Sequence, residues 1–354
     1  MKILVISLAG IGDTLFATPL IHELRANFPD ATIDALVLWR GSKSLLENNP
    51  HLNTVHQRNL ISESKIGSFI FLSKLRRAGY DFSINTFPQS RRDYQFVAKY
   101  INAPVRVGHE YGASGVIGRR LINKIIPVDY ARHAVENNLA LLPLLDAKPL
   151  TPPHHYEMFL TDVEQTWAAN FIAQQNLSWR PLLGIHAGSG GTKNLALRRW
   201  PLENYIELVR RLREKEPGLA ILFLGGPEER EQYEKIREAA RGENLFFPKT
   251  ETLGQAAALL KKCDVFLSVD TALMHLAAAM KVNAQIVIET PTWNKPIEPY
   301  GNPFTLVKNP AVAGRNLEFY RYDGRGIQGS PKELQRCMAS VTAESVFDAV
   351  MKLI

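Results

Sequence analysis

The stretch that decides the fold is Lys2-Ile3-Leu4-Val5-Ile6-Ser7-Leu8, followed at once by Ala9-Gly10-Ile11-Gly12-Asp13. The first seven residues form an almost continuous apolar run, which is typical of a strand buried on both faces of a parallel sheet. The glycines allow the backbone to turn tightly. A helix is predicted after the turn, over residues 14–27, and a second strand over 32–39. The chain therefore opens with a βαβ unit of a doubly wound sheet.

The same alternation returns past the middle of the chain. Strands are predicted at 181–186, 219–224, 264–268 and, as the last strand, 284–288; helices are predicted at 161–175, 202–214, 252–261 and 270–280. The predicted fold class is α/β, with two Rossmann-like doubly wound domains facing a central cleft. We expect an N-terminal domain over 1–165, a C-terminal domain over 166–335, and a helix in 336–354 that packs back on the N-terminal domain.

Length and composition fit two globular domains in the cytoplasm. The chain has 354 residues, 45% of them hydrophobic and 22% charged, so each half can bury a core. Cys263 and Cys337 lack the spacing of a zinc or redox motif and are expected to be reduced thiols. The apolar run at the N-terminus is too short for a signal peptide, and no stretch approaches the ~18 apolar residues of a membrane-spanning helix.

Positive charge is concentrated between Arg58 and Lys124, within a formal net charge of +7. Such a cluster suggests an anionic partner, which could be a phosphorylated lipid, an acidic sugar or a nucleic acid. An ordinary solvated basic surface explains the charge equally well.

The loops that follow the strands are the places where an open α/β sheet binds ligands. In the first loop, Leu15 occupies the third glycine position of the dinucleotide fingerprint, so that motif is absent. Asp13 lies at the start of the predicted helix. It could cap that helix or act as a general base at the mouth of the cleft.

A second cluster is Ser268-Val269-Asp270-Thr271-Ala272-Leu273-Met274-His275, where a predicted strand passes into a helix. The unpaired amides and the positive dipole of a helix N-terminus suit a diphosphate, and Thr271 adds a hydroxyl. Asp270 has the wrong charge to meet a phosphate, so we expect it to cap the helix or to bind a ribose or sugar hydroxyl. His275 could reach a phosphate or form a hydrogen bond in the core.

A third cluster begins at His186 and continues through small residues to Thr192, with Arg198-Arg199-Trp200-Pro201 after it. Small residues and guanidinium groups together could cradle an anion, although a solvent-exposed loop is the simpler alternative. Glu228, after Gly225-Gly226-Pro227, could approach a ribose. No spacing of His, Cys or Asp suits a metal that holds a diphosphate, so a metal-independent site without a cofactor is expected.

Taken in order along nearly the whole chain, these motifs resemble glycosyltransferase family nine, the ADP-heptose:lipopolysaccharide heptosyltransferases. Gly10-Ile11-Gly12-Asp13 matches the family's G-x-G-D, and residues 268–275 look like its S-x-D-T-G-x-x-H. The loop at His186–Ser189, the turn at Arg198–Pro201 and the ending around Cys337-Met338 are also similar. Ala272 departs from the family's usual glycine, Thr290-Pro291-Thr292 replaces G-P-T, and Arg198 stands nearest to a lysine that members use on the donor.

The resemblance implies a GT-B type fold and an inverting, metal-independent transfer of a heptose, or a related sugar, from ADP-heptose to the lipopolysaccharide inner core. Asp13 would be the catalytic base. The donor-binding residues would be Gly12, His186, Gly188, Ser189, Arg198, Glu228, Asp270, Thr271, Ala272 and His275. The anionic, lipid-linked acceptor would contact Lys74, Arg76, Arg77, Arg91 and Arg92. The enzyme would be cytoplasmic, in peripheral contact with the inner membrane, and no nucleic acid is expected to bind.

Two alternatives use the same architecture or the same charge. A sugar-nucleotide epimerase would isomerise its nucleotide sugar without an acceptor. A non-enzymatic protein that binds nucleotides or nucleic acid would use the basic surface and show no preference for a nucleotide sugar.

Overall fold

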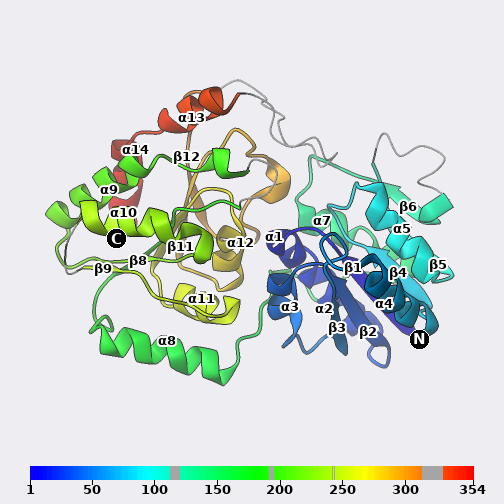
Figure 1. Ribbon diagram of the computed structural model, residues 1–354. Coiled ribbons are helices and arrows are strands. Elements are labelled where there is room, and N and C mark those ends of the chain that lie inside the picture. Colours follow the sequence, from blue (N-terminus) through cyan, green and yellow to red (C-terminus); the bar gives the residue numbers. More distant parts are fainter. Residues whose placement is uncertain (112–119, 191–194, 241, 243, 313–329) are drawn as a thin grey trace. The chain divides into compact units, whose positions relative to one another are not determined.

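Two six-stranded sheets form the framework of the computed structural model of the chain (Figure 1). The structure describes residues 1–111, 120–190, 195–240, 242, 244–312 and 330–354. The chain divides into two units between Phe159 and Leu160, and the short segment Lys295–Tyr300 belongs to the first unit. The expected boundary was 165/166.

All six strands of the first unit are parallel. They are β1 (Lys2–Ser7), β2 (Thr32–Val37), β3 (Thr54–Gln57), β4 (Phe82–Asn85), β5 (Val105–Glu110) and β6 (Lys124–Pro127), in the spatial order β3-β2-β1-β4-β5-β6. The helices are α1 (Ile11–Leu15), α2 (Thr18–Asn27), α3 (Arg40–Leu46), α4 (Lys65–Arg77), α5 (Arg92–Ile101) and α7 (Ala134–Leu139), with the 3-10 helices η1 (Leu142–Leu145) and η4 (Lys295–Ile297). Helices α4 and α5 pack together, as do α2 and α7.

The second unit repeats this plan. Its strands are β7 (Leu182–His186), β8 (Ala220–Phe223), β9 (Leu245–Phe246), β10 (Val265–Ser268), β11 (Ala284–Ile288) and β12 (Phe304–Val307), all parallel and in the order β12-β11-β10-β7-β8-β9. The helices are α8 (Asp162–Gln174), α9 (Leu202–Lys215), α10 (Arg230–Ala239), α11 (Leu253–Leu260), α12 (Ala272–Ala279), α13 (Pro331–Ala339) and α14 (Ala343–Met351), with η2 (Leu195–Arg198) and η3 (Pro227–Glu229).

The strand order of each sheet fixes where a ligand can bind. In the first sheet the order reverses between β1 and β4, and in the second between β7 and β10. At such a switch point the connections leave in opposite directions, which opens a crevice at the carboxyl ends of the two central strands. Residues just after Ser7, Asn85, His186 and Ser268 therefore lie at the binding edge of their own sheet. The predicted fold class, α/β with two Rossmann-like doubly wound domains, is confirmed.

The helix predicted over 14–27 is broken into α1 and α2. Pro19 stands in the first turn of α2, where its missing N–H is no loss but where it cannot continue a helix that arrives from α1. The strands β3, β4, β5, β6 and β9 were not predicted, and neither was β12, since 284–288 was taken as the last strand. With only four residues and a mostly unburied pattern, it carries little of the apolar periodicity that reveals a strand.

The prediction that 336–354 packs on the N-terminal domain is wrong. Met338, Val346 and Val350 belong to the core of the second unit, and α14 packs against α9, β11 and β12. The indole Nε1 of Trp200 also donates to the carbonyl of Val341, at 2.8 Å. The apolar stripe of α14 completes the core of the sheet nearest to it in the chain.

Across the part of the chain that the structure describes, no helix is both long enough and apolar enough to cross a membrane.

Candidate active site

The switch point of the second unit brings together two of the predicted clusters. His186 ends β7 and Ser268 ends β10, and the two residues are direct neighbours in the parallel pairing of these strands. Both are buried. The Oγ of Ser268 has no hydrogen-bond partner among the described residues. The loops around 187–190 and 269–271 therefore leave one edge of the sheet side by side.

His186 is held in a defined tautomer. Its Nδ1 lies 2.8 Å from the carbonyl oxygen of Leu224, and because a carbonyl can only accept, Nδ1 carries the proton. Burial lowers the pKa of His186, against the opposing charge of Glu229. The neutral ring then offers Nε2 as a hydrogen-bond acceptor.

Arg198 and Asp270 form a buried ion pair at this edge. The side chains are 9% and 10% exposed, and Nη1 of Arg198 also donates to the Thr292 hydroxyl, at 3.2 Å. Nε of Arg198 has no hydrogen-bond partner among the described residues. Burial raises the pKa of Asp270, and the guanidinium of Arg198 opposes that rise. Asp270 thus pairs with an arginine and does not cap the helix.

The cap of α12 is Thr271. Its hydroxyl accepts from the amide of Met274 at 3.3 Å, which satisfies one of the donors that every helix N-terminus leaves unpaired. The other backbone amides of the first turn of α12, including that of Ala272, are those that a bound anion would meet. His275 lies one turn further on and is 3% exposed, with Nε2 3.9 Å from Asp270 Oδ1. Burial lowers the pKa of His275 to about 3, so it is neutral at pH 7.

The two glutamates after Gly225-Gly226-Pro227 differ in burial. Glu228 is exposed, whereas Glu229 is 5% exposed and accepts from the amide of Gly226 at 2.9 Å. Arg199 donates to the other oxygen of Glu229, at 3.4 Å. A Cβ on Gly188 would lie 2.3 Å from that same oxygen, so the buried carboxylate requires a glycine there. The sequence G-G-P-E-E alone does not show which glutamate turns inward.

Ser189 is fully buried beside Gly188. Gly191 and Thr192 of the predicted anion cradle lie outside the described residues. Gly12, expected among the donor-binding residues, lies in α1 of the first unit and is half-buried.

Asp13 lies at the carboxyl edge of the first sheet, in the third position of α1. Its Oδ2 accepts from the amide of Gly10 at 2.7 Å, so the carboxylate does serve as a cap, as one of the two predicted readings had it. Its charge also acts on Tyr111, whose pKa is raised chiefly by burial and to a smaller extent by Tyr130 and Asp13. The half-buried carboxylate is therefore fixed in place beside the crevice between β1 and β4.

Gln89 lines the same crevice and was missed by sequence reasoning. Its amide nitrogen donates to the carbonyl of Ile6 at the end of β1, and to the carbonyl and hydroxyl of Thr86 after β4 at 3.0 and 3.1 Å. The backbone N–H of Gln89 donates to the Tyr111 hydroxyl at 2.7 Å. Gln89 is 2% exposed, and no described residue donates to its Oε1. A glutamine two residues before a basic pair carried no motif that would have singled it out.

The five basic residues proposed for an acceptor fall at two different edges. Arg91 and Arg92 stand at the start of α5, which follows the carboxyl end of β4. Lys74, Arg76 and Arg77 lie in the last turn of α4, and α4 leads to the amino end of β4. A helix of this length spans about 20 Å. Lys74, Arg76 and Arg77 therefore lie near the edge opposite Asp13, and we do not retain them as contacts of a reacting group.

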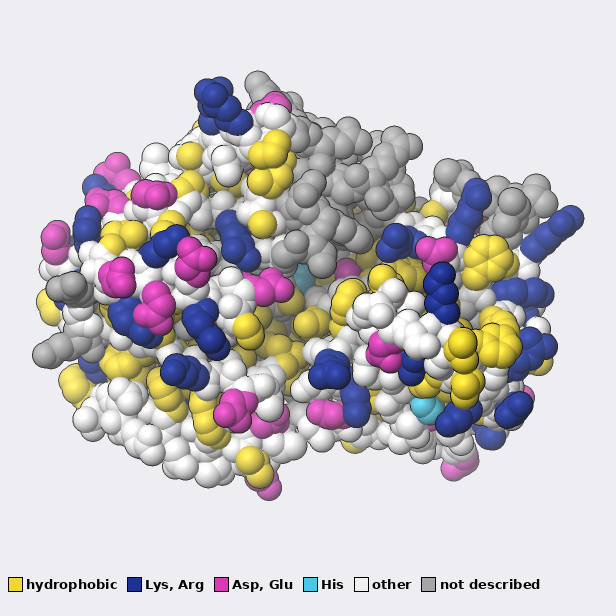
Figure 2. All heavy atoms as spheres, viewed as in Figure 1, with side chains coloured by type: hydrophobic (Ala, Val, Ile, Leu, Met, Phe, Trp, Pro, Cys, Tyr) yellow, Lys and Arg dark blue, Asp and Glu magenta, His cyan; other side chains and the backbone are white. Residues whose placement is uncertain are grey.

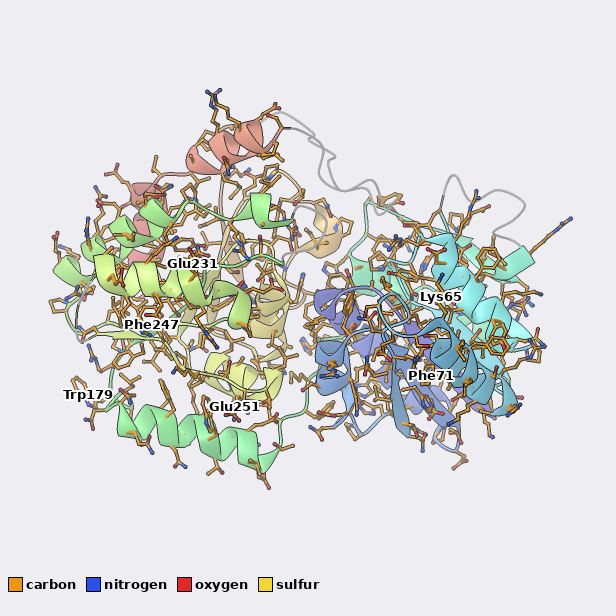
Figure 3. All side chains as sticks on the ribbon, viewed as in Figure 1. Lys65, Phe71, Trp179, Glu231, Phe247 and Glu251 are labelled. Carbon is orange, nitrogen blue, oxygen red and sulfur yellow. The ribbon has the colours of Figure 1, made fainter. Side chains whose placement is uncertain are left out.

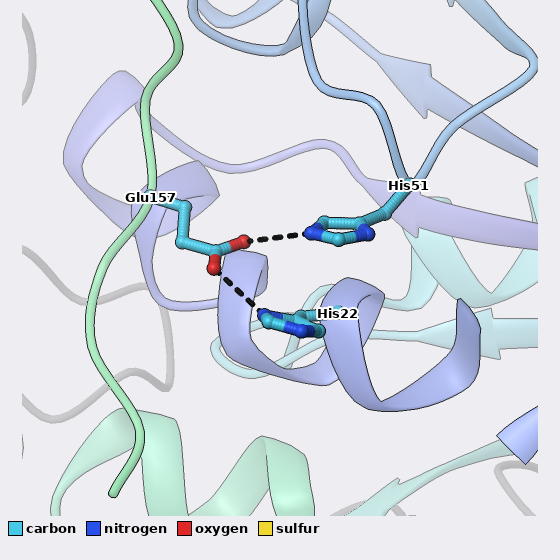
Figure 4. Close-up of side chains that lie close together, drawn as sticks. All are labelled: His22, His51 and Glu157. Carbon is cyan, nitrogen blue, oxygen red and sulfur yellow. Dashed lines mark hydrogen bonds and ion pairs between the residues drawn. The ribbon is translucent and has the colours of Figure 1, made fainter. Parts of the chain in front are cut away.

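One cluster in the first unit has the composition of a metal site. His22, His51 and Glu157 each offer one ligand atom, and these atoms lie within 4.8 Å of one another. Figure 4 shows His22 on α2, His51 in the loop after α3 and Glu157 on the extended segment before α8. Burial, together with the charges of His22 and Arg25, lowers the pKa of His51 to about 4. Sequence spacing could not reveal this group, because its members come from three separate segments.

Comparison with known proteins places the chain among glycosyltransferases. A profile of glycosyltransferase family 9 (heptosyltransferase) matches residues 69–318. The chain is 26% identical to lipopolysaccharide heptosyltransferase 3 of Escherichia coli, over 76% of this chain and 78% of that one. It is 25% identical to lipooligosaccharide heptosyltransferase 2 of Haemophilus influenzae, over 92% and 93% of the two chains.

A solved structure shows the same fold. The E. coli heptosyltransferase WaaC with ADP-2-deoxy-2-fluoro heptose superposes with a TM-score of 0.72 at 18% identity, over 99% of each chain. The matched profile spans well over half of the chain, including all the strands from β4 to β12. The chain is therefore a glycosyltransferase and belongs to glycosyltransferase family 9, the heptosyltransferase family.

Proposed function

We propose that the protein transfers a heptose from ADP-heptose to the inner core of lipopolysaccharide, with inversion at the anomeric carbon. The relatives named above are lipopolysaccharide and lipooligosaccharide heptosyltransferases, and the WaaC structure holds an ADP-heptose analogue. The observation that carries the proposal is the meeting of His186, Arg198, Asp270 and Thr271 at the switch point of the second sheet.

The donor would bind at that switch point. The diphosphate would accept from the first amides of α12, whose dipole favours an anion, and from the guanidinium of Arg198. Nε2 of His186 would accept a hydrogen bond from a hydroxyl of the nucleotide sugar. Ser268 Oγ and Arg198 Nε are buried polar atoms with no partner among the described residues, and such atoms cost free energy unless a ligand or water pairs with them.

The acceptor would bind at the switch point of the first sheet, with its hydroxyl at Asp13. The hydroxyl oxygen would attack the anomeric carbon, the bond from that carbon to the diphosphate would break, and Asp13 would take the hydroxyl proton. A single displacement of this kind inverts the anomeric centre. Gln89 Oε1, at the same crevice, is a candidate acceptor for a second hydroxyl of the sugar.

The leaving ADP would be stabilised without a divalent metal. Its developing negative charge would meet the α12 amides and the guanidinium groups of Arg198 and Arg199, which are already fixed in place. Preorganised donors of this kind can stabilise an anionic leaving group as a metal does.

The acceptor is expected at a membrane surface, and α4 offers a face for it. Ile66, Phe69 and Ile70 are 75%, 59% and 52% exposed, at a spacing that places them on one side of the helix. Phe71 instead packs on the core, and Lys65 begins the helix (Figure 3). Figure 2 shows apolar and basic side chains mixed over α4 and α5. Exposed apolar side chains among cations suit the interface of an anionic bilayer.

A donor panel tests the proposal. ADP-heptose should raise the melting temperature of the protein more than UDP-N-acetylglucosamine, GDP-mannose or ADP alone, because a ligand bound only to the native state stabilises it. Turnover should need a lipopolysaccharide-core acceptor and should not rise when Mg²⁺ is added. Isomerisation of the nucleotide sugar without an acceptor would contradict transfer and favour an epimerase.

A further inference from the structure

We infer that His22, His51 and Glu157 form a binding site for one divalent transition-metal ion, for which Zn²⁺ is the best match. His22 Nδ1 lies 2.7 Å from Glu157 Oε1, and His51 Nε2 lies 3.5 Å from Glu157 Oε2. All three ligand atoms lie within 4.8 Å of one another. Around a tetrahedral Zn²⁺ with bonds of about 2.0–2.2 Å, neighbouring ligand atoms are roughly 3.4 Å apart. Small rotations of the three side chains would therefore bring the ligand atoms within bonding distance of one ion.

Hydrogen bonds hold the segment that carries Glu157 along α2. The fold therefore places the carboxylate beside the histidines. Asn27 exchanges hydrogen bonds with the backbone of Lys148, at 2.8 and 3.2 Å. The fully buried Glu23 accepts from the amides of Leu150 and Thr151, at 2.7 and 2.8 Å. The amide of Glu157 donates to the Thr18 hydroxyl at 2.9 Å. These contacts run from the last turn of α2 to its first.

The remaining ligand, His51, is fixed from the other side. Its ring stacks on that of His22, with centroids 4.2 Å apart and an interplanar angle of 17°, and it meets the ring of Phe159 edge-on. Arg25, whose charge acts on His51, donates to the carbonyls of Pro29 and Ala31 at 2.8 Å, to that of His51 at 3.3 Å and to Asn53 Oδ1 at 2.8 Å. Its guanidinium is thus held by oxygen atoms of the chain on either side of β2 and around His51.

The ligand chemistry selects the class of metal. Two imidazoles and one carboxylate suit Zn²⁺, Cu²⁺ or Ni²⁺, whereas Mg²⁺ and Ca²⁺ prefer sites made only of oxygen. The side chains are 35%, 18% and 20% exposed for His22, His51 and Glu157. The site is therefore open to solvent, and water would complete the coordination. Because Glu157 stands just before the unit boundary after Phe159, an ion there would hold the connecting segment on α2. This inference does not depend on the proposed sugar transfer.

Metal titration of the full-length, tag-free protein, stripped with EDTA, tests the site. Co²⁺ should bind one ion per chain with visible absorption bands of a low-coordinate nitrogen and oxygen environment, and Zn²⁺ should displace it. His22→Gln and His51→Gln should each weaken Co²⁺ binding by about tenfold or more. His155→Gln removes a histidine of the same segment from outside the cluster and should leave the affinity within about twofold of the wild type.

Equal Co²⁺ affinity in the wild type and in the His22→Gln/His51→Gln double variant would overturn the inference, as would absence of saturable binding to the wild type. X-ray absorption on the zinc-loaded wild type gives an answer even if a variant fails to fold. Scattering from two imidazoles would support the site, and a shell of oxygen alone would refute it.

Discussion

The guanidinium of Arg198 and the carboxylate of Asp270 form a buried ion pair that joins η2 to the turn before α12, across 72 residues of sequence. The pair gives Asp270 an ionic partner, whereas the expected role as cap of α12 falls to Thr271. It also orients Arg198, since Thr292 accepts from the same nitrogen, at 3.2 Å. Part of the positive charge of Arg198 is thereby neutralised before any diphosphate arrives.

Breaking this pair from one side should destabilise the second unit. Arg198→Ala or Asp270→Ala alone leaves an uncompensated buried charge, for which about 3–5 kcal/mol is the usual loss in the free energy of unfolding. The double variant should lose clearly less than the sum of the two single losses, because neither charge remains. Urea unfolding followed by tryptophan fluorescence, to which Trp200 in the core of the same unit contributes, measures all three. Additive losses would show that the two charges do not stabilise each other.

The acid stability of the first unit should depend on His109. This residue is 3% exposed, and burial lowers its pKa from 6.5 to about 4, although a hydrogen bond to the carbonyl of Asn137 at 3.0 Å opposes the shift. Between these pH values the unfolded chain binds a proton that the folded chain does not. The contribution of His109 to stability is therefore fully present above pH 6.5 and is lost as the pH falls toward 4.

The variant His109→Gln removes the imidazole that binds this proton and keeps a hydrogen-bond donor for the Asn137 carbonyl. The slope of unfolding free energy against pH should fall by up to about 1.4 kcal/mol per pH unit between pH 6.5 and 4. Denaturant melts at half-unit steps of pH give that slope for the two proteins. An unchanged slope would mean that His109 takes up its proton in the folded state.

Of the twelve strands among the described residues, the sequence predicted six, because these buried parallel strands read as apolar runs. The strand predicted at 181–186 is observed as Leu182–His186, and that at 284–288 as Ala284–Ile288. It also found both loops of the second switch point, since the ends of β7 and β10 carry small and polar residues. Position along the chain could not give the pairing of Arg198 with Asp270, or the inward turn of Glu229 beside an exposed Glu228, because both follow from tertiary packing.

Charge along the sequence does not show which basic residues lie at the carboxyl edge of the first sheet. Lys74, Arg76 and Arg77 are as basic as Arg91 and Arg92, but α4 runs from the carboxyl edge of the sheet to the amino edge, and their place in its last turn puts them at the far end. The direction of a helix between two parallel strands decides which of its ends can face a ligand. A count of charges along the sequence contains no such information.

The apolar face of α4 should bind anionic bilayers. The triple variant Ile66→Ser, Phe69→Ser, Ile70→Ser removes three side chains that are more than half exposed, so the fold should keep its stability. Sedimentation with phosphatidylglycerol vesicles should show binding weakened by about tenfold or more, and wild-type binding should fall as salt rises.

The control for this experiment is Val163→Ser with Trp179→Ser, which removes two apolar side chains of the second unit that are 77% and 78% exposed. It should bind the vesicles as the wild type does. An equal loss in both variants would point to general surface hydrophobicity and not to the face of α4. If the wild-type protein does not sediment with the vesicles at low salt, the proposed membrane contact is wrong.

Replacing Asp13 by Asn should separate chemistry from binding. Asn can still accept from the amide of Gly10 through its side-chain oxygen, so the cap at 2.7 Å and the fold are expected to persist. It cannot take a proton from an acceptor hydroxyl, and a well-placed general base contributes roughly 10²–10⁴-fold to the rate. We therefore expect kcat to fall by that factor, while the Kd of ADP-heptose measured by calorimetry changes by less than about twofold. Asp30→Asn, at an exposed site of the same unit, should alter neither quantity. If the Asp13 variant instead loses donor affinity as steeply as turnover, Asp13 serves the donor, and the base that activates the acceptor has to be sought among the other residues at the carboxyl edge of the first sheet.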